Sequence, residues 1–260
     1  LIENAWWEGG IDYNSYERVL TLQSDRIRRL AYTYRDKSKV FVSDLSGRKE
    51  QKEKRYSSAL TNFAIYQYMT SLSLWDKKDE FVCHKPYTYS KKDPMGSMDW
   101  TNTQITHLIN EGNGNCFALA SLFRILSERL NSDAMLCTAP SHIYIRHADE
   151  KGTYYNVELS SRAFPGTGTI ETLTYTPDEA TRNNIALREL TVKQSIALCL
   201  VYLAKGYEHK FNTKEDEFIL ACAEATLKYD DHNLNAMLLK AEVLENRLVK
   251  HGNEIKQIQN

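Results

Sequence analysis

The chain has 260 residues, a formal net charge of −1, and 42% hydrophobic and 26% charged residues. These values are ordinary for a globular protein with a substantial core. They argue against nucleic acid or an anionic membrane surface as a partner, and no run of 18 apolar residues predicts a membrane-spanning segment.

The five cysteines form an odd set without a CxxC pair. A disulfide framework or a zinc site is therefore not indicated, and we expect neither a metal nor a cofactor. The first residue is Leu1 rather than Met. We take this as a sign that a targeting segment has been removed, which slightly favours an extracytoplasmic location.

Residues 1–55 predict a mainly helical, polar N-terminal segment. Helical spacing of apolar residues extends over 13–34, through Leu20 and Ile27. The highly charged stretch 47–55 is typical of a solvated connector rather than of a binding patch.

Residues 56–175 predict the central domain, of class α+β. Apolar spacing indicates a helix over 56–75, an extended piece over 81–89 and a second helix over 99–109. This second helix leads into a turn of glycine and asparagine residues at 112–115.

Cys116 follows that turn and begins a third helix, whose apolar stripe extends over 117–130. In the first helical turn, free N–H groups and the helix dipole favour an anion, so this position favours a nucleophilic thiolate. Asn115 or Asn113 is the expected N-cap. The main-chain N–H of Cys116 is the natural donor to an oxyanion, with Asn110, Asn113 and Asn115 as candidates for a second donor.

A strand over 134–139 is expected next, followed by a hairpin that begins at His142. His142 and alternate residues after it share one face of the first strand, and Asn156 and Glu158 share one face of the second. If the hairpin folds about Glu150, His142 and Glu158 are directly opposed, so the carboxylate can orient the imidazole. This arrangement requires a loop with an odd number of residues or a bulge. Asn156 is the alternative orienting residue.

Residues 176–260 predict a C-terminal helical segment, reached through a Gly/Pro loop over 164–170. Three helices are expected over 191–207, 214–229 and 233–250. Their apolar residues are too many to remain exposed, so we expect the helices to pack on the central domain. Ala236 and Ala241 have a spacing similar to that of a tetratricopeptide repeat, and a protein partner could bind these helices.

The three short motifs of the central domain resemble those of the transglutaminase-like superfamily, whose fold is related to that of papain. They are Gly114-Asn115-Cys116, Ser141-His142-Ile143-Tyr144-Ile145 and Tyr155-Asn156-Val157-Glu158-Leu159. The closer resemblance is to bacterial members with tetratricopeptide-like C-terminal helices, and it covers roughly residues 55–250. The superfamily usually has Asp where this chain has Glu158. The resemblance implies a Cys-His-Glu triad and a papain-like core more strongly than it implies activity.

Two functions are compatible with these residues. The first is a cysteine-dependent acyl-transfer enzyme that acts on a peptide or protein, with Cys116 as nucleophile, His142 as acid and base, and Glu158 as orienting group. We expect hydrolysis rather than transamidation, since transamidation needs a second site that excludes water. The alternative is a non-catalytic module that binds a peptide or protein and keeps the triad as a relic.

Overall fold

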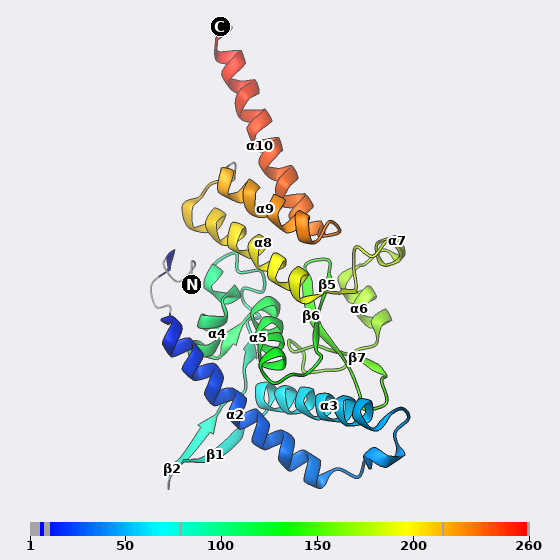
Figure 1. Cartoon of the computed structure of the whole chain (residues 1–260). Helices are drawn as coiled ribbons and strands as arrows, with labels where there is room; N and C mark the ends of the chain where they lie inside the picture. Colours follow the sequence, from blue (N-terminus) through cyan, green and yellow to red (C-terminus); the bar gives the residue numbers. More distant parts are fainter. Residues whose placement is uncertain (1–5, 8–10, 78–79, 215, 259–260) are drawn as a thin grey trace.

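A central helix, α5 (Cys116–Arg129), lies against a four-stranded sheet in the computed structural model (Figure 1). The structure describes residues 6–7, 11–77, 80–214 and 216–258. It combines α-helices with small sheets, of which the four-stranded sheet and the β1–β2 pair are antiparallel and the β3–β4 pair is parallel, so the predicted α+β class is confirmed.

The sheet has the strand order β7-β6-β5-β8, and each neighbouring pair is antiparallel. Its strands are β5 (Met135–Ala139), β6 (His142–Ala148), β7 (Tyr154–Val157) and β8 (Arg188–Glu189). Ala139 pairs with His142, so only Pro140 and Ser141 separate β5 from β6. Ser141 adopts a left-handed conformation with φ 52°, which completes this tight turn and places His142 at the first position of β6.

The two faces of the sheet are covered by different elements. Ile143 and Ile145 of β6 belong to the main core, together with the buried residues of α5. Tyr144 points to the other face, where it packs with Cys137 and with Ile170 of α6 (Thr167–Thr174). This alternation follows from the period of two in a strand.

The register of the β6–β7 hairpin differs from the expected one. Ile145 pairs with Val157, a shift of two residues, so the predicted direct pairing of His142 with Glu158 is wrong. The five-residue loop 149–153 sets this register, because the Asp149 side chain accepts hydrogen bonds from the main-chain N–H groups of Lys151 and Thr153. A shift by an even number of residues keeps both side chains on the same face, and Glu158 therefore lies diagonally across from His142.

The N-terminal part contains α2 (Tyr13–Lys37), the short 3-10 helix η1 (Val42–Asp44) and α3 (Lys49–Thr70). The helix α3 begins inside the charged stretch that we expected to be a connector, because its Lys, Glu and Gln residues are good helix formers. The expected domain boundary at residue 55 therefore falls inside a helix. Leu20 and Ile27 of α2 are buried in the same core as α5, so the N-terminal helices are part of the central unit.

Short elements fill the region between α3 and α5. They are β1 (Ser73–Lys77), β2 (Glu80–His84), β3 (Thr88–Tyr89), η2 (Trp100–Thr103), α4 (Ile105–Glu111) and β4 (Asn113–Gly114). The helix predicted over 56–75 ends early because β1 pairs with β2, and the helix predicted over 99–109 is divided by the extended Gln104. Gly114 is required where it lies, since a Cβ atom there would come within 3.0 Å of the Ala118 side chain.

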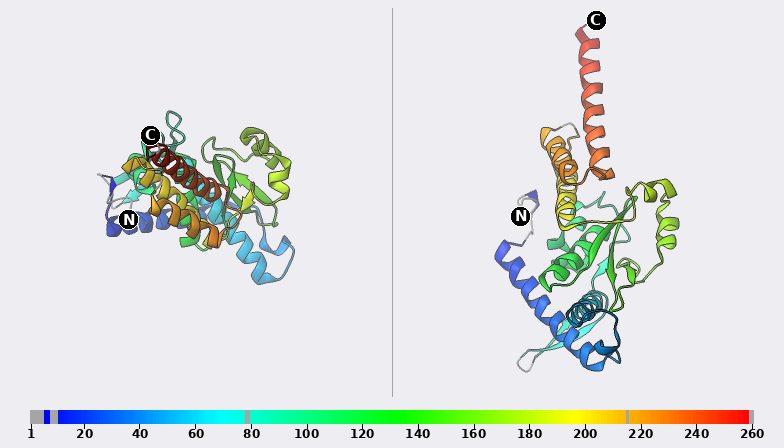
Figure 2. Two further views of the ribbon diagram at one scale, coloured as in Figure 1. Left: turned by 90° about the horizontal axis from the view of Figure 1, so that it is seen from above. Right: turned by 45° about the vertical axis from the view of Figure 1, so that its right-hand side comes forward.

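The C-terminal part contains α7 (Asp178–Arg182), α8 (Val192–Phe211), α9 (Glu217–Tyr229) and α10 (Leu234–Ile258). The expected loop over 164–170 already includes the start of α6, and β8 interrupts a segment that we expected to be entirely helical. Leu198 of α8 is buried in the main core, as expected for packing on the central unit. The far half of α10 extends away from the rest of the molecule (Figures 1 and 2).

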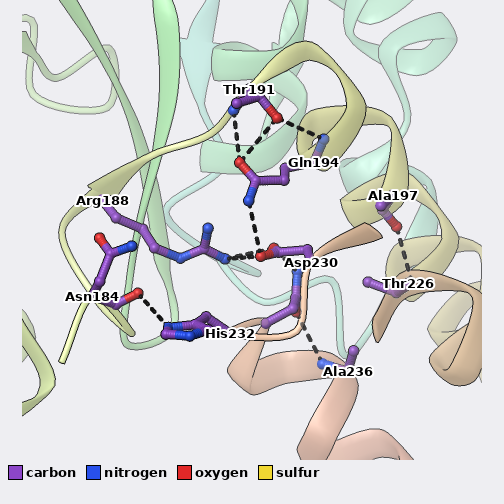
Figure 3. A network of polar contacts seen from close by, with 10 residues as sticks. Asn184, Arg188, Thr191, Gln194, Ala197, Thr226, Asp230, His232 and Ala236 are labelled. Carbon is purple, nitrogen blue, oxygen red and sulfur yellow. Dashed lines mark hydrogen bonds and ion pairs between the residues drawn. The ribbon is translucent and has the colours of Figure 1, made fainter. Parts of the chain in front are cut away.

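A buried ion pair connects the sheet to these helices (Figure 3). Arg188 of β8 donates to both carboxylate oxygens of Asp230, at 2.6 and 2.5 Å. Asp230 also accepts from Asn233 at 3.0 Å and from Gln194 at 3.3 Å. The carboxylate therefore joins β8, α8 and the α9–α10 turn. In the described part of the chain, no helix is both long and apolar enough to cross a membrane.

Candidate active site

Cys116 is the first residue of α5, as the glycine and asparagine turn predicts. Asn115 is the N-cap, and its side-chain oxygen accepts a hydrogen bond from the Ala118 N–H at 3.1 Å. The main chain of Asn115 is fixed in turn, because its N–H donates to the Asn102 carbonyl at 2.9 Å. Cys116 is half-buried, so its side chain at the helix N-terminus is partly accessible.

His142 hydrogen-bonds to two groups, the Cys116 side chain and the Glu158 carboxylate. The bond to Glu158 joins Nε2 to Oε2, which leaves the Nδ1 side of the ring for the thiol. Burial disfavours the imidazolium, but the hydrogen bonds to Cys116 and Glu158 outweigh it and raise the pKa of His142 to about 10. The site therefore favours a charged histidine next to the sulfur.

Glu158 is held in place by main-chain hydrogen bonds with Ala163 and by a hydrogen bond from Ser160 to its carboxylate. Its N–H and carbonyl exchange hydrogen bonds with Ala163 at 2.9 and 3.0 Å, and its Oε1 accepts from the Ser160 N–H at 3.0 Å. Burial acts to raise the pKa of this carboxyl group, but the bonds from His142 and Ser160 lower it on balance. Tyr89 lies close to the same groups, since burial and the nearby Cys116 and Glu158 raise the pKa of its hydroxyl.

A cavity of about 260 Å³ opens on Cys116 and His142. The central unit contributes Trp100, Asn115 and Thr138 to its lining, and Leu198 and Tyr202 come from α8. The cavity is small enough that it suits one side chain or a short segment of a substrate rather than a folded protein.

One face of α10 forms part of the cavity wall. Asn235, Leu238, Leu239 and Glu242 line it at helical spacing. Glu242 forms an ion pair with Lys205 of α8 at 2.8 Å, and both residues border the cavity. Sequence analysis missed this wall. The periodicity of α10 identifies an inward face but carries no information on what that face contacts.

The three support candidates lie in different surroundings. Asn115 lines the cavity, whereas Asn113 and Asn156 are not among its lining residues. The Asn156 oxygen accepts from Arg146 at 2.8 Å, and its nitrogen donates to the Pro165 carbonyl at 3.1 Å. Glu158 rather than Asn156 therefore contacts His142.

The other cysteines differ from Cys116 in their surroundings. Burial raises the pKa of Cys137 to about 12, and burial also raises the pKa of Cys222. Cys83 and Cys199 are exposed. Among the described residues, no three or more His, Cys, Asp or Glu side chains are grouped as they would be around a metal ion.

The arrangement supplies a nucleophile, an adjacent acid and base, and a carboxylate that fixes the imidazole. The main-chain N–H of Cys116, in the first turn of α5, is oriented as the first N–H groups of helices are, which suits an oxyanion. Comparisons with family models, with curated proteins and with solved structures find no match for this chain.

Proposed function

We propose that this chain is a cysteine-dependent acyl-transfer enzyme that hydrolyses an amide or peptide bond. The observation that carries the proposal is the continuous hydrogen-bonded series Cys116, His142 and Glu158, which ends at a cavity. The motifs that resemble those of transglutaminase-like proteins support the same proposal. In this interpretation the core is papain-like, and the C-terminal helices correspond to a tetratricopeptide-like unit.

In the first step the Cys116 thiolate attacks the substrate carbonyl carbon. The C–S bond forms, the carbonyl oxygen becomes an oxyanion, and the main-chain N–H of Cys116 stabilises it. His142 then gives its proton to the leaving amine as the C–N bond breaks, which leaves a thioester. Glu158 keeps the imidazole in the required orientation and stabilises its charged form.

In the second step a water molecule attacks the thioester, and neutral His142 accepts its proton. The C–S bond breaks, the acid product leaves, and the thiolate and imidazolium are restored. An amine could attack in place of water. We favour hydrolysis because no described feature of the cavity selects an amine over water: its lining combines apolar side chains, the Lys205–Glu242 ion pair and neutral polar groups such as Thr138 and Asn235.

The proposal is tested by competition among the five cysteines for iodoacetamide at pH 6, with mass spectrometry to locate the label. We expect Cys116 to react at least about tenfold faster than exposed Cys83, since the Cys116 side chain hydrogen-bonds to His142, an adjacent acid and base that activates a nucleophile. His142→Ala should abolish this advantage.

Cys83 and Cys199 are the internal controls, because both are exposed and Cys137 and Cys222 are buried. A wild-type protein in which Cys116 reacts no faster than Cys83, and in which His142→Ala changes nothing, would leave the alternative of a binding module with a relic triad.

The reaction type is tested with a library of peptide carboxamides. Hydrolysis predicts release of ammonia or of a shortened peptide by the wild-type protein and none by Cys116→Ala. Incorporation of a fluorescent alkylamine in place of hydrolysis would instead identify a transamidase.

A further inference from the structure

A second cavity, of about 350 Å³, lies beside the candidate active site. It is formed where α2, α4, α5 and α8 meet. Tyr202 borders both cavities and stacks on Phe117, with ring centroids 3.4 Å apart. The second cavity therefore shares a wall with the candidate site, but neither Cys116 nor His142 lines it.

Most of the lining of this second cavity is apolar. Ile105, Phe117, Ile125 and Leu136 contribute from the central unit, and Val192 contributes from α8. Its volume falls at the lower end of the range of small-molecule pockets. Such a lining suits a hydrocarbon chain or ring.

Three buried polar atoms in the lining have no hydrogen-bond partner among the described residues. They are the Gln104 amide nitrogen and the hydroxyl oxygens of Ser121 and Ser195. The three residues are 7%, 6% and 8% exposed, respectively. Buried polar groups are nearly always hydrogen-bonded, so three such groups from different elements around one cavity indicate a missing partner. The Gln104 nitrogen is a donor and requires an acceptor.

A partly buried arginine at this cavity could bind an anion. The Arg124 side chain lines the cavity and is only 14% exposed. Its carboxylate partner, Glu128, also borders the cavity, but it lies 3.6 Å away, beyond hydrogen-bond distance, and is 60% exposed. The guanidinium is thus largely removed from water and has no hydrogen bond from Glu128, whose side chain is mostly exposed.

We propose that this cavity binds an amphipathic carboxylate, a small molecule with one carboxylate group and an apolar body. The carboxylate accepts hydrogen bonds from Arg124 and from the buried amide and hydroxyl groups, and the apolar body fills the space between α5 and α8. The proposal does not depend on catalysis, because it rests on residues outside the triad.

Octanoate is the probe, and isothermal titration calorimetry is the measurement. We expect one octanoate to bind each chain, and 1-octanol, which has the same chain but no charge, to bind at least tenfold more weakly. Arg124→Met keeps the apolar stem of the side chain and removes its charge. It should weaken octanoate binding at least tenfold.

The matched control is Arg129→Met on the same helix. Arg129 forms an ion pair with Glu17 at 2.9 Å and is not a lining residue of this cavity. It should leave octanoate affinity within twofold of the wild type. Ser195→Leu, which places a larger side chain in the cavity, should abolish binding, with circular dichroism as the check that the variant is folded.

Three results would each overturn the proposal. They are the absence of octanoate binding to the wild-type protein, equal affinity for octanoate and 1-octanol, and equal effects of Arg124→Met and Arg129→Met. Any of them would mean that the cavity is a hydrated gap in packing rather than a carboxylate site.

Discussion

Two buried ionic groups in this protein have similar chemistry and different surroundings. The Arg188–Asp230 pair has side chains 5% and 0% exposed, and further hydrogen bonds from Asn233 and Gln194 surround the carboxylate (Figure 3). The His142–Glu158 pair is 20% and 12% exposed, and the histidine also contacts Cys116 at the edge of a cavity.

The difference separates an ion pair whose hydrogen bonding is saturated from one that borders a thiol and a cavity. The carboxylate of Asp230 is saturated by partners from three elements, so it fixes the position of the C-terminal helices. His142 instead hydrogen-bonds to the Glu158 carboxylate, which is fixed, and to the Cys116 side chain, which can form a new bond. Both pairs bury charge, but only the His142–Glu158 pair lies next to a thiol and at the edge of a cavity.

The largest effect is expected from Asp230→Ala, which leaves the Arg188 charge buried without a partner. We expect the free energy of unfolding to fall by about 3–5 kcal/mol in urea denaturation. The labelling rate of Cys116 in the folded protein should stay close to that of the wild type. Asp25→Ala is the control, because its pair with Arg28 is exposed and should contribute less than about 1 kcal/mol. A loss for Asp230→Ala no larger than for this control would contradict the structural role.

A smaller effect is expected from Glu158→Gln, which keeps the shape of the side chain and removes its charge. The iodoacetamide rate of Cys116 at pH 6 should fall by less than in His142→Ala, since the imidazole loses its orienting anion but remains beside the sulfur. One of the contacts that raise the pKa of His142 is lost, so NMR titration should show this pKa below the wild-type value.

The raised pKa of His142 also affects stability. The contribution of the protonated ring is present in full below its ordinary pKa of 6.5 and is lost as the pH rises through about 10. The wild-type unfolding free energy should therefore decline over this range more steeply than that of Glu158→Gln. Parallel pH profiles of the two proteins would show that Glu158 does not act on His142.

The smallest effect is expected when both members of the structural pair are replaced, as Arg188→Met with Asp230→Leu. Because neither charge is left alone, the free energy of unfolding should lie within about 1 kcal/mol of the wild type, far above that of Asp230→Ala. The Cys116 labelling rate should be unchanged. A double variant as unstable as Asp230→Ala would show that the pair contributes more than mutual neutralisation.

The sequence was sufficient to predict the elements that carry Cys116 and His142, whereas the strand expected to contain Glu158 ends at Val157 and Glu158 lies one residue beyond it. The helix from Cys116, the strand from His142 and the face shared by His142 and Glu158 all follow from local periodicity and cap residues. The register was wrong by two residues, because it depends on how the Asp149 side chain closes the loop. The face on which a strand residue lies can be predicted from whether its position is odd or even along the strand. The register between two strands also depends on the geometry of the turn that joins them.

The remaining features depend on contacts between distant segments. Strand β8 has two residues and no alternation to identify it, and it exists because it pairs with β5. The cavity wall from α10 arises because Asp230 fixes the helix relative to the sheet. Neither feature has a signal within its own segment.

The helix α10 forms one wall of the cavity, although it lies far along the sequence from Cys116, His142 and Glu158. The three groups that would react lie between Cys116 and Glu158, whereas Asn235, Leu238 and Glu242 determine the shape and polarity of the opposite wall. Side chains on this helix can be exchanged without altering the turn that caps α5 or the hairpin that holds His142. Under the proposed function, variants confined to α10 should therefore alter substrate preference while the reacting groups stay unchanged.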